Sequence, residues 1–323
     1  MTLKKRFHST ERSPYMHVVN PNISYVKMDN SIGKGTVHTY NTFDGISILK
    51  INISSKTWPI STSLGRKNFI FLNYCIKGRC EVSLANGLTT CVSEGEICIS
   101  KSYAIKEFFY PLGKYEGIKL IFDIDTLKQT SEFFINSFDM DILETLEQYT
   151  TTNLTFVASA NEKLKQLINE LQETTTNNNL FEMRLNILRL LYLISNPKII
   201  LANKKQVYLS PSQVQLANEV EEIITKDLQK KITIASLSQK FGVSETTLKT
   251  YFKGLYGTNI STYLQEIRMN EAARQLSQTK NQISDIAGSV GYDNQSKFAA
   301  VFKKFLKISP SEYRRLKQFE NNK

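Results

Sequence analysis

The sequence predicts an α+β protein of two domains: a strand-rich N-terminal domain that ends in a helical hairpin, and an all-helical C-terminal domain. A length of 323 residues suits two domains of ordinary size, each able to bury its own core. Between Ile46 and about Asp123, short apolar segments alternate with Gly, Asn and Ser, which is typical of strands and turns. Beyond Asp125 the apolar residues recur mainly at helical spacing.

Short strands account for the N-terminal domain. The strand pattern occurs over residues 46–53, 69–76, 80–84 and 97–99. The pairs Lys77-Gly78, Asn86-Gly87 and Glu94-Gly95 predict turns between them, and Asn-Gly is a strong hairpin signal. Many short strands indicate a barrel or a sandwich.

Aromatic residues also recur in this strand-rich region. At such spacing they belong more often to a core than to a pocket lining, so the sequence identifies no effector site. They are Trp58, Tyr74, Tyr103, Phe108, Phe109 and Tyr110.

Helices follow, over residues 127–149 and then as a hairpin over 161–195. Two roles stay open for this hairpin: it covers the sheet, or its leucine stripe packs against a second copy of the chain. Asn196-Pro197 ends the hairpin, and the polar stretch that follows places the domain boundary near Asn203. The expected domains are therefore 1–203 and 204–323.

The chain is basic, with 41 Lys and Arg against 30 Asp and Glu and a net charge of +11. Such an excess predicts attraction to polyanions, either nucleic acid or an acidic membrane surface. No apolar run reaches the roughly 18 residues that span a bilayer. Lys4, Lys5 and Arg6 are not followed by the apolar segment of a signal peptide. We therefore expect a cytoplasmic protein without a membrane partner.

The sequence gives little support to catalysis or to a bound metal. Cys75, Cys80, Cys91 and Cys98 lie in strand-like runs without the spacing of a zinc site, so we interpret them as small buried apolar residues, with a zinc or redox site as the alternative. The chain contains no G-x-S-x-G, no H-E-x-x-H and no phosphate-binding loop. We expect no enzyme activity and no cofactor.

One helical pattern occurs twice in the C-terminal domain, and the two copies are offset by about 50 residues. Leu237-Ser238, Gly242, Leu248 and Phe252-Lys253 recur as Ile286-Ala287, Gly291, Phe298 and Phe302-Lys303. Each copy, over 234–256 and 283–306, has the pattern of a short helix, a turn opened by Gly and a longer helix. A Gly suits this position because the chain must adopt a left-handed conformation to turn steeply between two helices. Each copy is therefore a predicted helix-turn-helix unit.

A linker helix is predicted between the two units, over 260–277. Its 18 residues, at roughly 1.5 Å each, give a length near 27 Å. A rigid spacer of that size brings the two second helices close to one duplex turn apart, about 34 Å. One polypeptide can then enter two successive major grooves.

Basic residues concentrate around the second unit: residues 294–317 hold seven Lys and Arg and one acidic residue. A solvated helix face is the alternative for such a cluster, but beside a duplicated helix-turn-helix it favours phosphate contacts. Each neutralised phosphate adds roughly 0.9 to the salt dependence of binding. The candidate phosphate contacts are Lys253, Lys297, Lys303, Lys304, Lys307, Arg314 and Arg315.

Residues from Val214 to Arg315 resemble the AraC/XylS family of transcriptional regulators. The second half matches the family signature nearly position by position, at Ile286-Ala287, Val290-Gly291-Tyr292, Ser296, Phe298, Phe302-Lys303-Lys304, Ser309-Pro310 and Tyr313-Arg314. The first half agrees at Leu237, Gly242, Ser244, Leu248, Phe252-Lys253, Gly257, Tyr263-Leu264 and Arg268. One departure is Lys307, where the signature usually has Gly after the second recognition helix.

The resemblance implies that exposed residues early in each recognition helix face the edges of DNA bases. They are Glu245, Thr246, Lys249 and Thr250 in the first unit, and Gln295, Ser296, Ala299 and Ala300 in the second. A glutamine can bond bidentately to adenine, a lysine can donate to guanine, and Thr or Ala methyl groups can pack on thymine.

The resemblance also implies that the N-terminal domain is a cupin-like effector and dimerisation domain. The expected partners are double-stranded promoter DNA, a small-molecule effector of unspecified class, a second copy of the chain and RNA polymerase. None of the three histidines lies between Asn73 and Ser100, which disfavours a metal-dependent cupin enzyme. Two alternatives remain: a cysteine-zinc alkyl-acceptor repair protein with a similar DNA-binding module, and an architectural DNA binder without an effector.

Overall fold

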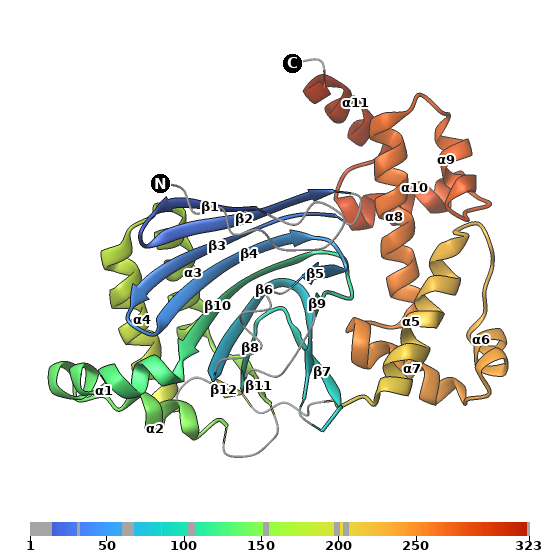
Figure 1. The fold of residues 1–323 in the computed structure, drawn as a ribbon. Helices are drawn as coiled ribbons and strands as arrows, with labels where there is room; N and C mark the ends of the chain where they lie inside the picture. Colours follow the sequence, from blue (N-terminus) through green and yellow to red (C-terminus); the bar gives the residue numbers. More distant parts are fainter. Residues whose placement is uncertain are drawn as a thin grey trace. The chain divides into compact units, whose positions relative to one another are not determined.

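The computed structural model of the chain describes residues 15–30, 33–59, 68–84, 86–101, 107–150, 155–196, 201–202 and 207–321. Two compact units are present, Met1–Ser210 and Pro211–Lys323 (Figure 1). The first unit extends a few residues beyond the expected boundary near Asn203, which itself lies outside the described residues. Leu209 belongs to this unit because its N–H and C=O pair with Thr89, both at 2.8 Å.

An antiparallel sheet forms most of the N-terminal unit (Figure 1). Its strands follow the order β1-β2-β3-β4-β10-β6-β8-β11-β12, and β7 pairs with β6. A second sheet consists of β5 and β9 alone. The strands are β1 Tyr15–Asn20, β2 Ile23–Asn30, β3 Gly33–Phe43, β4 Ile46–Ser54, β5 Thr57–Pro59, β6 Phe69–Ser83, β7 Thr89–Ser93, β8 Glu96–Lys101, β9 Glu107–Phe109, β10 Tyr115–Asp123, β11 Phe156–Ala160 and β12 Leu201–Ala202.

Two features of this sheet differ from the sequence prediction. Among the described residues, three strands precede Ile46, where the strand region was expected to begin. Only three of the eleven residues of β3 are buried, so its apolar pattern is weak. The expected turn at Lys77-Gly78 is absent, because β6 continues through Gly78 as an irregularity. The register against β10 shifts between Cys75 and Lys77, and the adjacent Gly78 has a φ of 91° that suits glycine.

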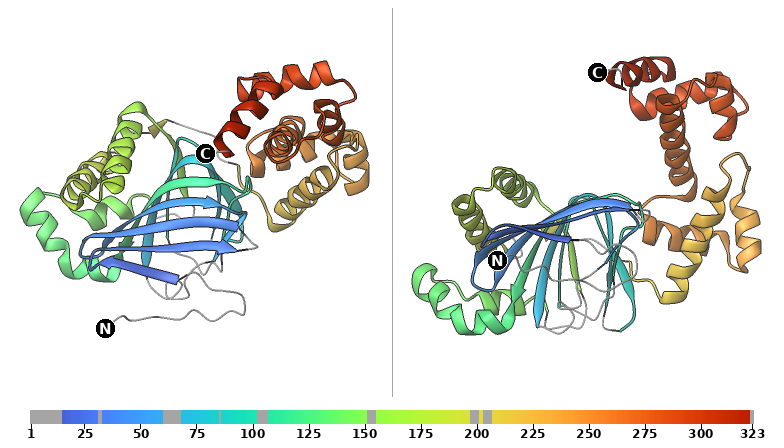
Figure 2. Two further views of the ribbon diagram at one scale, coloured as in Figure 1. Left: turned by 90° about the horizontal axis from the view of Figure 1, so that it is seen from above. Right: turned by 45° about the horizontal axis from the view of Figure 1, so that its top comes forward.

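Four helices lie together on one side of the sheet (Figure 2). They are α1 Ile124–Phe138, α2 Ile142–Glu147, α3 Glu162–Thr176 and α4 Leu180–Ser195. Each begins after an Asp or Asn whose side chain accepts a backbone N–H of the first turn. Their buried residues share one core with sheet residues such as Ile48, Leu72 and Leu120. The hairpin of α3 and α4 therefore covers the sheet.

A second core lies on the opposite face of the sheet. Trp58 from β5 and Phe108 from β9 pack there with residues of the large sheet, among them Tyr115. All four cysteines are buried and outside any disulfide, and burial raises the pKa of their thiols, to about 11 for Cys80 and about 12 for Cys98.

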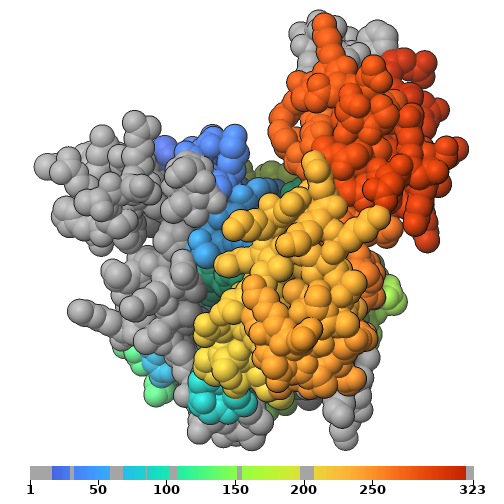
Figure 3. Space-filling view, turned by 90° about the vertical axis from the view of Figure 1, so that its right-hand side faces the viewer, coloured from blue at the N-terminus to red at the C-terminus, as the bar shows by residue number. Residues whose placement is uncertain are grey.

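The C-terminal unit is entirely helical in its described residues. Its helices are α5 Pro211–Lys226, α6 Ile234–Phe241, α7 Glu245–Tyr256, α8 Ile260–Gln278, α9 Ile283–Ser289, α10 Gln295–Leu306 and α11 Pro310–Asn321. Figure 3 shows two lobes within it, one in yellow to light orange and one in deep orange to red. A strand-rich unit followed by a helical unit confirms the α+β class. Among the described helices, none has an apolar stretch long enough to cross a bilayer.

Candidate nucleic-acid interface

The two repeated units fold as helix-turn-helix pairs, α6 with α7 and α9 with α10. In the first turn Gly242 has a φ of 64°, and Ser244 caps α7 by accepting the N–H of Thr247 at 3.1 Å. In the second turn Gly291 has a φ of 81°, and Asn294 caps α10 by accepting the N–H of Lys297 at 2.8 Å. Left-handed glycine and a polar cap thus recur at equivalent positions.

The second helix of each pair buries one face and exposes the other. Leu248 and Phe252 of α7 are fully buried, and so are Phe298 and Phe302 of α10, which pack with residues of α8 and α9. Because an α-helix places residues three and four apart on one face, burial of these side chains leaves the intervening polar ones in solvent. This alternation supplies two helix faces that DNA can approach.

All four predicted base-reading residues of α7 are exposed: Glu245, Thr246, Lys249 and Thr250. Two interactions that the sequence did not reveal join them. Lys249 Nζ lies 2.9 Å from Glu245 Oε2, and Thr250 Oγ1 donates to the carbonyl of Thr246 at 2.8 Å. An exposed pair at this spacing contributes only about 0.5 kcal/mol, so Lys249 can exchange its partner for a base at small cost.

On α10, Gln295, Ser296 and Ala300 are exposed, whereas Ala299 is half-buried against the core. Gln295 is the first residue of the helix, directly after the Asn294 cap. Residues at the start of a recognition helix are those that commonly reach base edges in helix-turn-helix complexes. Gln295 and Ser296 therefore present more contact surface than Ala299.

Six of the seven predicted phosphate contacts are exposed: Lys253, Lys297, Lys303, Lys304, Lys307 and Arg315. Arg314 is placed differently. It is half-buried, and its Nη2 donates to the carbonyl of Asn281 at 2.6 Å, while its buried Nε has no acceptor among the described residues. This guanidinium ties α11 to the loop between α8 and α9.

Lys307 ends α10 in a left-handed conformation, with a φ of 66°. The family signature usually has glycine at this position, and glycine adopts this left-handed conformation without strain. A non-glycine residue there costs roughly 1 kcal/mol or slightly more. In exchange, an exposed ammonium follows directly after the second recognition helix.

Contacts around Arg268 connect the loop between α5 and α6 with the turn of the second helix-turn-helix pair. Arg268, in the middle of α8, donates from Nη2 to the carbonyl of Leu228 at 2.7 Å, and its guanidinium lies 6.0 Å from the Tyr292 ring. A Cβ on Gly291 would lie 2.3 Å from the same carbonyl. Lys231 and Asp293 add an exposed ion pair at 2.6 Å, which holds the pKa of Asp293 below its usual range. The sequence contained Arg268 but indicated no role for it.

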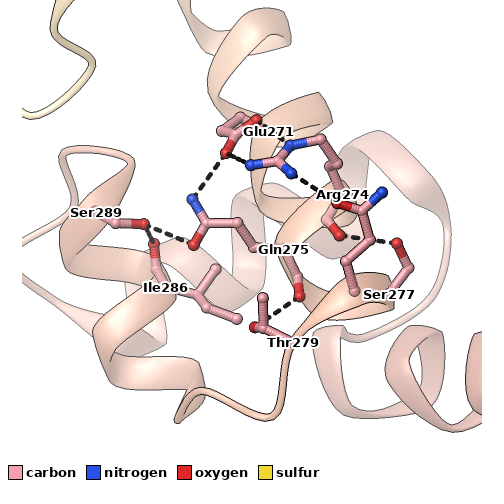
Figure 4. Close-up of polar contacts among 8 residues, drawn as sticks. Glu271, Arg274, Gln275, Ser277, Thr279, Ile286 and Ser289 are labelled. Atoms are coloured by element: carbon pink, nitrogen blue, oxygen red, sulfur yellow. Dashed lines mark hydrogen bonds and ion pairs between the residues drawn. The ribbon is translucent and has the colours of Figure 1, made fainter.

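The C-terminal end of α8 is also fastened to α9 (Figure 4). Gln275 Nε2 donates to Glu271 at 2.9 Å, and Gln275 Oε1 accepts from the hydroxyl of Ser289 at 3.0 Å. Arg274 holds both carboxylate oxygens of Glu271, at 2.7 and 2.8 Å. These hydrogen bonds fasten α9, the short helix of the second pair, to the linker helix α8. The angle between α8 and α9 therefore does not depend only on the loop that joins them.

Two helix-turn-helix pairs with exposed second helices on a common linker helix define a DNA-binding module of the tandem type. A family model described as "Helix-turn-helix domain" matches residues 237–316. The transcriptional activator CfaD of Escherichia coli is 34% identical over 128 residues, which cover 38% of this chain and 46% of that protein. The transcriptional activator AarP of Providencia stuartii is 32% identical over 102 residues, which cover 32% of this chain and 76% of AarP.

The chain belongs to the AraC family of helix-turn-helix transcription regulators. Among solved structures, the C-terminal domain of AraT, a response regulator from Geobacillus stearothermophilus, is 35% identical, covers 33% of this chain and 87% of that domain, and has a TM-score of 0.31. The chain spans about half the length of the first curated relatives it matches, between 46% and 54%.

Proposed function

We propose that this protein is a cytoplasmic, sequence-specific regulator of transcription that binds promoter DNA with both helix-turn-helix units. The observation that supports this best is the pair of exposed faces on α7 and α10, connected by α8. Nineteen residues give α8 a length of roughly 28 Å, near the spacing of about 34 Å between successive turns of one groove. The exposed basic residues after α10 add sequence-independent attraction to phosphate.

In this proposal the N-terminal unit binds a small-molecule effector and thereby changes how the two recognition helices, α7 and α10, bind a promoter. RNA polymerase is the further partner at that promoter. The protein then acts by binding and performs no catalysis. The alkyl-acceptor alternative needs a reactive thiolate, which a low thiol pKa favours. Burial instead raises the thiol pKa of all four cysteines, to about 12 at Cys91 for example.

Genomic fragments captured on the full-length protein at physiological salt, followed by footprinting, test the proposal. We expect protection of two major-groove segments about one turn apart, upstream of a few genes. A regulator of this kind binds its site about a thousandfold or more tighter than bulk DNA. Diffuse retention without a shared site would instead support an architectural DNA binder.

Replacing Gln295 with Ala is expected to relax the preference at one base pair of the site. The reason is the loss of a bidentate amide contact, worth roughly 1–3 kcal/mol of discrimination, from the exposed start of α10. A site-selection assay measures it, with Gln282→Ala before α9 as the control, since that residue is also exposed but lies outside the second helix of the pair. An unchanged base preference would show that Gln295 does not contact a base.

A dimer contact is proposed on the outer face of α4. Its inner face is buried against the sheet, whereas Phe181, Leu185 and Tyr192 are 69%, 45% and 63% exposed. Three large apolar side chains on one exposed helix face fit a second copy of the same helix. The hairpin then has both roles that the sequence left open.

The double substitution Phe181→Lys with Leu185→Lys is expected to convert a dimer to a monomer in sedimentation equilibrium. Two like charges at the centre of the contact would weaken association at least a hundredfold. Phe133→Lys is the control, because Phe133 is an exposed apolar residue of α1, 52% accessible, outside this stripe. A wild-type protein that remains monomeric at micromolar concentration would contradict the proposal.

A further inference from the structure

Lys119 is a buried lysine in the middle of the large sheet. It lies in β10, opposite Leu49 of β4 on one side and Asn73 of β6 on the other. Its neighbours in sequence, Ile118 and Leu120, belong to the core under the helices. Because side chains alternate across a strand, Lys119 faces the second core, on the side of the β5 and β9 sheet. Its residual exposure is 5%.

No carboxylate of the described residues forms an ion pair with Lys119. Two aromatic faces lie near its ammonium. Nζ lies 3.7 Å from the centre of the Phe108 ring and 5.5 Å from that of Phe71. Cation–π contacts stabilise an ammonium by about 2 kcal/mol at best, far less than the cost of removing it from water. Among the described residues, the ammonium therefore has no carboxylate within ion-pair distance.

A small cavity of about 30 Å³ adjoins this ammonium. One ordered water needs roughly 10–15 Å³ by the same measure, so the space fits about two waters or one carboxylate group. The cavity is lined by Phe71, Asn73, Cys80, Glu81, Val82, Ser83, Cys98, Ser100, Lys101, Phe108 and Lys119.

We propose that this cavity binds the carboxylate of a short-chain organic acid, with Lys119 as its counter-charge. A carboxylate supplies the negative charge that the buried ammonium lacks, and its planar three-atom head matches the volume. Ser83 and Ser100 can donate hydroxyl hydrogen bonds to it, and the Phe71 and Phe108 rings can pack against a short alkyl group. The proposal gives the chemical class of the effector. Binding of the carboxylate stands by itself, and only its effect on DNA binding rests on the proposed function.

Charges at the cavity give the binding a pH dependence. Burial lowers the pKa of Lys119, and a bound carboxylate would raise it again by favouring the ammonium. Glu81 also lines the cavity, and burial raises its pKa to about 7. The Cys80 and Cys98 thiols stay protonated, and Lys101 carries the remaining charge at the cavity. A rising pH thus removes the ammonium and adds a carboxylate, and both changes weaken the binding of an anion.

Fluorescence of the single tryptophan provides the assay, because Trp58 pairs in register with Phe108. Full-length protein is titrated with sodium formate, acetate and propionate at constant ionic strength, with acetamide as the neutral control and chloride as the inorganic anion. We expect saturation with at least one carboxylate, at least tenfold tighter at pH 6 than at pH 8, and no saturation with acetamide. Saturation with chloride at the same concentrations would overturn the assignment to a carboxylate.

Lys119→Met should abolish saturation, whereas Lys101→Met, at the exposed rim of the cavity, should change the affinity less than threefold. Glu81→Gln should retain binding and lose the part of the pH dependence around pH 7. If Lys119→Met does not fold, the nitrogen resonance of Lys119 in the wild-type protein should shift on addition of acetate. Unchanged binding in Lys119→Met, or no shift of that resonance, would overturn the proposal. The assay contains no DNA, so its failure is distinct from failure of the footprint.

Discussion

Gly291→Ala is expected to destabilise the C-terminal unit by about 3 kcal/mol, whereas Gly242→Ala should cost only about 1 kcal/mol. The two glycines hold equivalent positions in the repeated turns and share a left-handed backbone, with φ of 81° and 64°. A Cβ at Gly242 would meet open space, but one at Gly291 would lie 2.3 Å from the Leu228 carbonyl. The backbone penalty is common to both, so the difference measures the contact with the loop before α6.

Chemical denaturation of the full-length variants, followed by hydrogen exchange in α5–α11, measures this difference. Gly291→Ala should also tolerate DNA sites in which one half-site is displaced by a base pair, because Arg268 and Leu228 no longer hold the second turn. Equal losses of unfolding free energy in the two variants would show that the loop at Leu228 moves to accommodate a methyl group on Gly291. That result would contradict a fixed spacing between α7 and α10.

The double substitution Lys303→Ala with Lys304→Ala is expected to weaken binding to all DNA sequences alike, about thirtyfold at 0.15 M salt. Two lost phosphate contacts should flatten the slope of log K against log salt by nearly 1.8. Both lysines are exposed in the last turn of α10, where the helix dipole also favours positive charge. Base preference should not change, because phosphate contacts carry no sequence information.

Binding at several salt concentrations, to the specific site and to random DNA, measures both effects. Lys128→Ala with Lys163→Ala is the matched control, since it removes the same charge from exposed positions on α1 and α3. This control should leave the slope unchanged, because both lysines belong to the N-terminal unit. A steep slope retained in the Lys303 and Lys304 variant would assign the phosphate contacts to other basic residues.

Local signals explain why the helix-turn-helix pairs were predictable. The left-handed turns need Gly242 and Gly291, the helix starts need Ser244 and Asn294, and the buried faces need apolar side chains at helical spacing. Each requirement acts within a few residues, so it is visible in the chain. The early strands gave a weaker signal, because β3 buries few apolar side chains and obtains its partners from β2 and β4.

The sequence by itself determined the α+β class, the duplicated DNA-binding unit and the exposure of seven of the eight predicted base-reading residues, all but Ala299, because period and turn chemistry are local. Only the tertiary structure decided that Arg268 holds Leu228 near Gly291, that Arg314 is bound to Asn281 and that Lys119 is buried without a described carboxylate partner. These facts join residues between 33 and 63 positions apart, or depend on which sheet face a second layer covers. Strand alternation assigns Lys119 to one face of the sheet, but the sequence does not show whether that face contacts solvent or a second layer of the fold.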